Sequence, residues 1–74
     1  MIEELYYLQI QEEKKWKNVQ LIKFTPRNAL EIPYDKDFRE KSIKEKFLKI
    51  AEEKYKDYKS RIIKVIGDKL IILE

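Results

Sequence analysis

Residues 60–74 read SRIIKVIGDKLIILE, an apolar segment in a chain in which 42% of the residues are charged. Two runs of β-branched and aliphatic residues, 61–66 and 69–73, flank Gly67-Asp68, a pair suited to a two-residue hairpin turn. We therefore predict strands over 61–66 and 69–73. This hairpin is the feature that most constrains the fold, because its apolar residues have to be buried.

Both faces of this hairpin are apolar. Side chains of a strand alternate between faces, so Leu70 and Ile72 point one way and Ile71 and Leu73 the other. In the preceding strand the same alternation sets Ile62 and Ile66 against Ile63 and Val65. The fold must therefore cover two apolar surfaces.

The first third of the chain predicts a second hairpin. LYYLQIQ at 5–11 is rich in β-formers, with Tyr6, Leu8 and Ile10 on one face. WKNVQLIKF at 16–24 follows after a short polar connection, and its adjacent Leu21 and Ile22 indicate a bulge or burial on both faces. A short strand over 29–32 would fit between the two prolines of the chain.

A helix is predicted over 42–58. Ser42 and Glu45 match the capping box, in which the two side chains satisfy backbone N–H groups of the first turn. At 100° per residue one stripe is apolar, formed by Ile43, Phe47, Ile50, Ala51, Tyr55 and Tyr58 with Leu48 at its edge. Lys54 falls inside this stripe, where we expect its methylenes to lie on the core and its ammonium to reach water.

These elements predict a single α+β domain over residues 1–74, with two layers and the order ββ(β)αββ. One helix would pack on a small mixed or antiparallel sheet. The order resembles that of the β-grasp architecture, to which ubiquitin belongs. The sequence ends in Leu73-Glu74 and lacks the glycine pair of conjugated modifiers, so that function is not implied.

Composition argues against most enzyme classes. The 74 residues include no histidine and no cysteine, the usual bases, nucleophiles and zinc ligands. Glu31, Asp35 and Asp37 could gather a cation, but turn and helix-start chemistry explains them better. We predict no catalytic residue, cofactor, metal, membrane contact or small-molecule substrate. Without cysteines or an apolar leader, a cytoplasmic protein is expected, in the host cytoplasm if the chain is viral.

The apolar face left by a single helix predicts a protein–protein interface. Exposing about three large aliphatic side chains forgoes roughly 5 to 9 kcal/mol, which rivals the whole stability of a domain of this size. We assign the interface to Ile62, Ile66, Ile71, Leu73 and Tyr7. The partner is a second copy or another protein, as for the small inhibitor and accessory proteins of viruses and mobile elements.

The alternative function is nucleic-acid binding. Lysines surround the one tryptophan in the first hairpin, where bases could stack on the ring while cations follow the phosphates; the set comprises Lys14, Lys15, Trp16, Lys17 and Lys23. Against it, the net charge is only +3, and Glu12 and Glu13 adjoin the basic run.

Overall fold

The computed structural model describes residues 3–25 and 35–73. It contains one helix and one four-stranded antiparallel sheet, with the strands in the spatial order β2-β1-β3-β4. The elements are β1 (Glu4–Glu12), β2 (Lys15–Phe24), α1 (Lys36–Lys54), β3 (Ser60–Ile66) and β4 (Lys69–Ile72). The predicted two-layer α+β fold is confirmed, with an antiparallel rather than a mixed sheet. The short strand predicted over 29–32 lies outside the described residues.

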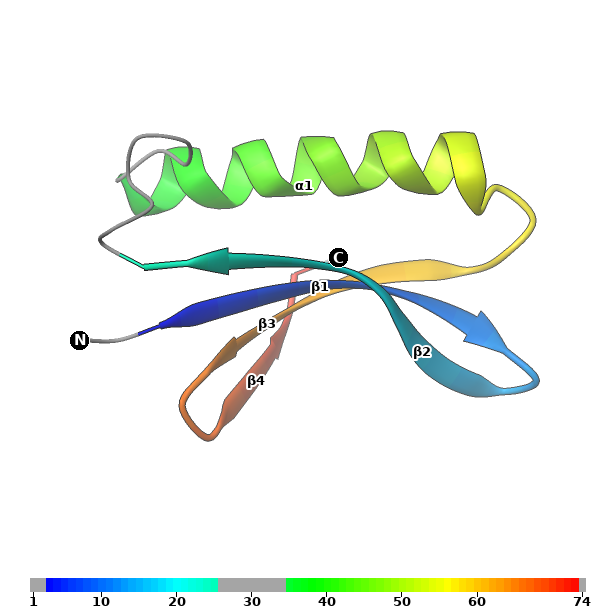
Figure 1. Ribbon diagram of the computed structural model, residues 1–74, viewed down its shortest axis with the longest axis horizontal. Helices are drawn as coiled ribbons and strands as arrows, with labels where there is room; N and C mark the ends of the chain where they lie inside the picture. Colours follow the sequence, from blue (N-terminus) through cyan, green and yellow to red (C-terminus); the bar gives the residue numbers. More distant parts are fainter. Residues whose placement is uncertain (1–2, 26–34, 74) are drawn as a thin grey trace.

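The helix connects two strands that are not neighbours. β2 and β3 both pair with β1, one on each side, so the chain crosses over β1 between them. α1 makes this crossover and lies along one face of the sheet (Figure 1). The β3–β4 hairpin turns away from the helix (Figure 1). The sheet therefore has a helix face and an open face.

The helix begins earlier than the capping-box pattern predicts. Its N-cap is Asp35, whose Oδ1 accepts a hydrogen bond from the N–H of Phe38 at 3.1 Å, and Ser42 lies well inside α1. Asp is as good an N-cap as Ser, so the predicted start of the helix at Ser42 was wrong. Phe38, in the first turn of α1, is exposed to solvent. The helix also ends at Lys54 rather than at Tyr58.

The core lies between α1 and the even-numbered residues of β1. Ile43, Phe47 and Ala51 of the predicted stripe are buried, and they pack against Tyr6, Leu8, Phe24 and Ile62 of the sheet. Ile50 and Tyr55 pack at the margin of this cluster. Lys54, which we expected to lie on the core, is exposed in the last turn of the helix.

A bulge in β2 decides which side chains share a face. Gln20 pairs with Leu8 but Asn18 pairs with Gln9, so Val19 has no partner opposite it. The extra residue resets the alternation. As a result Trp16 and Leu21, five residues apart, lie on the same face of the sheet. The adjacent Leu21 and Ile22 indicated a bulge or burial on both faces. β2 does contain a bulge, but it lies at Val19, and Leu21 and Ile22 pair regularly with Tyr7 and Tyr6 on opposite faces.

Both hairpins close with two-residue turns. Gly67 in the β3–β4 turn has a φ of 56°, a conformation that glycine adopts without steric cost. In the β1–β2 turn Glu13 and Lys14 take positive φ values of 52° and 69°. Residues other than glycine rarely adopt this backbone conformation. Glu13 and Lys14 are therefore not a pair that predicts a tight turn from the sequence.

Candidate functional site: the open face of the sheet

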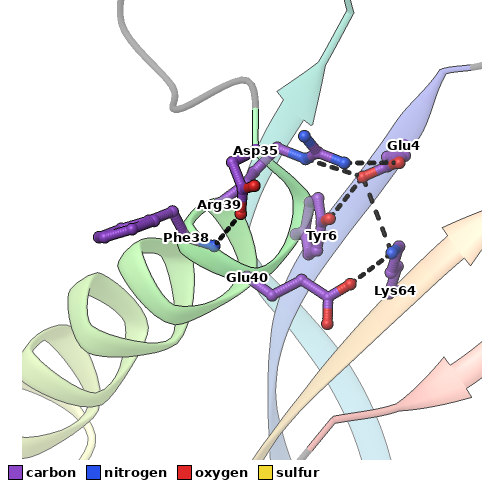
Figure 2. Close-up of polar contacts among 7 residues, drawn as sticks. All are labelled: Glu4, Tyr6, Asp35, Phe38, Arg39, Glu40 and Lys64. Carbon is purple, nitrogen blue, oxygen red and sulfur yellow. Dashed lines mark hydrogen bonds and ion pairs between the residues drawn. The ribbon is translucent and has the colours of Figure 1, made fainter.

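The most concentrated group of charges lies on the helix face, at the start of β1 (Figure 2). Glu4 accepts two hydrogen bonds from Arg39 of α1, one from Nε and one from Nη2, each at 3.0 Å. The hydroxyl of Tyr6 also donates to Glu4. Lys64 of β3 lies 2.6 Å from Glu40 of the helix and 3.8 Å from Glu4. The cluster therefore joins β1, α1 and β3.

The electrostatics of this cluster are balanced. Burial alone would raise the pKa of Glu4, but the hydrogen bond from Tyr6 and the charges of Lys64 and Arg39 outweigh it and hold the pKa below its usual value. Burial and the bond to Glu4 raise the pKa of Tyr6. The guanidinium of Arg39 also lies 3.9 Å from the centre of the Phe24 ring. Two cations thus face two carboxylates.

The charges of this cluster are compensated within the cluster. The side chains of Arg39 and Lys64 are 5% and 2% exposed, and no buried side-chain polar atom in the described residues lacks a partner. A buried charge is costly unless it is paired, and here each charge is paired.

The opposite face of the sheet carries a large apolar surface, which we call the open face. By strand register its apolar residues are Leu5, Tyr7, Leu21, Ile63, Val65, Leu70 and Ile72. Three of these side chains, Leu21, Leu70 and Ile72, are more than half exposed, at 52%, 58% and 56%. Ile63, at the centre, is buried by its neighbours. Scattered exposed leucines are ordinary, whereas a continuous apolar face indicates a binding surface.

The other end of the open face is aromatic and polar. The guanidinium of Arg61 lies 4.1 Å from the centre of the Trp16 ring. Arg61 Nε donates to Gln9 Oε1 at 2.7 Å, and Gln9 Nε2 donates to Asn18 Oδ1 at 2.6 Å. Three strands contribute to this chain of contacts. It fixes one side of the tryptophan ring and leaves the ring half-buried at the surface.

The structure separates the residues that were predicted to form the interface. Ile62 is buried under the helix, and Leu73 packs against the core, so neither lies on the open face. Ile66 and Ile71 share that side, since they pair with Glu4 and Lys64 of the cluster. Tyr7 alone of the five lies on the open face. Alternation grouped the four aliphatic residues on one face, but that is the face on which α1 packs, and only Ile71 of the four is exposed there.

The predicted basic set is also divided between surfaces. Lys14 occupies the hairpin turn, and Lys15 and Lys17 pair with Glu12 and Ile10, on the side opposite Trp16. Lys23 shares the face of Trp16 but stands seven residues along β2, roughly 20 Å away, and it forms an ion pair with Glu3 at 3.2 Å.

Sequence reasoning missed the residues that surround Trp16. Alternation with Tyr6 assigns Gln9 to the other face of the sheet, but nothing in the sequence indicates that it contacts Asn18 and Arg61. Alternation with Ile63 and Val65 assigns Arg61 to the same face. The sequence does not place a bulge at Val19, and this position is what brings Asn18 opposite Gln9.

No family model, curated protein or solved structure matches this chain. Residues 3–25 and 35–73 contain no group of three carboxylates close enough to hold a metal ion. In that same part of the chain, no helix has the length and apolar character that crossing a bilayer requires.

Proposed function

We propose that this chain is a non-catalytic binding protein whose open face docks on an apolar surface of a partner protein. The observation that carries the proposal is the exposure of Leu21, Leu70 and Ile72 around the buried Ile63. Covering three aliphatic side chains of this size gains several kcal/mol, about 1.5 to 3 for each one fully buried. A partner that covers this face therefore has a large driving force for binding.

The charge of the open face favours a protein over a nucleic acid. Among the described residues its two cations are Arg61, engaged by Trp16 and Gln9, and Lys23, paired with Glu3. Nucleic-acid binding relies on several cations that neutralise successive phosphates. Protein interfaces instead have an apolar centre with aromatic residues and arginine, which is the composition of this face.

The experiment compares two leucine substitutions of similar exposure. Leu21→Lys changes the open face, and Leu48→Lys changes the exposed side of α1, where Leu48 is 43% exposed. Immobilised wild type and both variants are used to capture proteins from an extract of the source cell. We expect a partner that wild type and Leu48→Lys retain but Leu21→Lys loses. The proposal is supported when the purified partner shows the same order of affinity for the three proteins.

Two outcomes would contradict the proposal. The first is a partner that binds all three proteins equally. The second is quenching of the single tryptophan, Trp16, by single-stranded oligonucleotide, with affinity that falls as salt rises, because that is the behaviour of a nucleic-acid site.

A further inference from the structure

The edge strand β4 is exposed on both of its sides. Leu70 and Ile72 are exposed on the open face, and Ile71, which pairs with Lys64 on the helix face, is 42% exposed. A partner lying on the open face would cover Leu70 and Ile72 but not Ile71. A neighbouring strand beside β4 would shelter all three, since it adds side chains to both faces of the sheet at once.

The backbone of β4 offers hydrogen-bonding groups to such a strand. Ile66 and Lys69 pair across the two-residue turn, and the N–H of Leu73 donates to the carbonyl of Ile62 at 2.8 Å. Because hydrogen-bonded pairs alternate along an antiparallel ladder, residues 69, 71 and 73 direct their backbone groups toward β3. The N–H and C=O groups of Leu70 and Ile72 therefore point outward. In the described residues no strand pairs with this edge of the sheet.

The two edges of the sheet differ in how they are protected. β2, the other edge, carries Lys15, Lys17 and Lys23 as well as the bulge at Val19. Lysines and bulges are devices by which natural edge strands avoid pairing with another chain. β4 has only Lys69, at its first position, and then three aliphatic residues.

We propose that β4 pairs antiparallel with β4 of a second copy of this chain, about a two-fold axis at Ile71. This register sets Leu70 opposite Ile72 of the second copy and Ile71 opposite its equivalent. Each Leu70–Ile72 pair exchanges two backbone hydrogen bonds, because both residues direct these groups outward. A register centred on Leu70 would instead oppose Lys69 to Ile71, so the apolar pairing favours the axis at Ile71.

The resulting dimer has one continuous eight-stranded sheet. A two-fold axis perpendicular to the sheet keeps both helices on one side and joins the two open faces on the other. The contact uses the edge of the sheet and so goes beyond the proposed function, which concerns the open face. Because β4 has four residues, we expect a small interface of the transient class, below about 1,200 Å².

Single cysteines test the register directly, because the chain contains no cysteine of its own. Opposed residues at a non-hydrogen-bonded position have Cα atoms about 4.5 Å apart, within the range of a disulfide. Ile71→Cys should form a disulfide-linked dimer under mild oxidation, whereas Leu48→Cys, at 43% exposure a close match, should not. Leu21→Cys reports on pairing through the open face.

A proline substitution tests the hydrogen bonds. Ile72→Pro removes an outward N–H, which an edge strand tolerates, while Ile72→Val keeps it. In sedimentation or light scattering we expect the apparent mass of wild type and of Ile72→Val to rise with protein concentration from 9.1 kDa toward twice that mass. Ile72→Pro should bind itself roughly thirtyfold more weakly, since two of the four intermolecular bonds are lost.

Three results would overturn the edge dimer. The first is a monomer at every concentration with no preferential Ile71→Cys crosslink. The second is a dimer that Ile72→Pro does not weaken although circular dichroism shows that the variant keeps its fold. The third is a dimer that crosslinks at Leu21→Cys instead. The first two results do not bear on the open-face proposal, whose test is partner loss in Leu21→Lys, at the opposite edge of the sheet. The third would favour the open face as the surface through which two copies pair.

Discussion

The two faces of the sheet come from the same strands, yet they have opposite characters. The helix face buries the ionisable side chains of Tyr6, Arg39 and Lys64, and each of them has a partner. The open face exposes aliphatic side chains and has an ordered polar end around Trp16. Two cations are thus buried while several large aliphatic residues are exposed, against the usual tendency. This difference teaches that alternation groups residues by face without saying which face is covered.

The largest expected difference between the faces is in how much stability is lost when an apolar side chain is replaced by alanine. Phe47→Ala should lower the free energy of unfolding by about 3 to 5 kcal/mol, because it leaves a cavity beneath α1. Leu21→Ala on the open face should change it by less than about 0.5 kcal/mol. Urea denaturation followed by Trp16 fluorescence measures both. Equal losses would mean that the open face is covered in the free protein.

The ion pairs on the two faces should differ almost as much in their contribution to the free energy of unfolding. Glu4→Gln leaves Arg39 and Lys64 with one carboxylate between them in a buried setting, so we expect a loss of about 3 kcal/mol. Glu3→Gln weakens the pair with Lys23, whose side chains are about half exposed, and should cost less than about 0.5 kcal/mol. A small effect at Glu4 would show that the cluster can exchange its partners.

A part of the stability conferred by Glu4 should disappear in acid. Its pKa is lower in the folded protein than the ordinary value of 4.5, so the unfolded chain binds the proton first as the pH falls. This contribution is complete above about pH 5.5 and is lost as the pH falls through the folded pKa. The stability difference between wild type and Glu4→Gln should narrow over that range. A constant difference from pH 7 to pH 3 would refute the role of the charge.

The fold could be predicted further than the site. Hairpin turns, alternation and the helical stripe are local patterns, and they predicted the order of the elements and the two hairpin pairings, but not the central pairing of β1 with β3. The buried cluster could not be found this way, because Glu4, Arg39 and Lys64 are far apart in sequence and charged residues are rarely buried. Ser42 failed as a cap because an equally good residue, Asp35, stood two turns earlier.

The sequence also does not show which face of the sheet the helix covers, for a similar physical reason. Ile62 and Ile63 are adjacent, both apolar and both buried, so hydrophobicity alone does not distinguish the helix face from the open face. The deciding fact is that Tyr6, Leu8 and Ile62 share a side, which depends on the register between β1 and β3. That register is a long-range property, and residues 60–66 do not encode it by themselves.

The smallest expected effect lies at the polar end of the open face. Arg61→Met keeps most of the aliphatic stem but removes the stacking on Trp16 and the hydrogen bond to Gln9. Each contact at a partly exposed site contributes about 0.5 to 1 kcal/mol, so the loss in stability should be about 1 kcal/mol.

A second variant separates the two contacts of Arg61. Arg61→Lys keeps the cation but loses the planar fork that both stacks and donates, so it should resemble Arg61→Met more than wild type. Near-ultraviolet circular dichroism of the single tryptophan reports whether the ring stays ordered. If both variants retain the wild-type signal and stability, the polar end is held by β1 and β2 alone. Arg61 would then be available to contact a partner, and the division of the open face into an apolar half and a locked polar half would have to be abandoned.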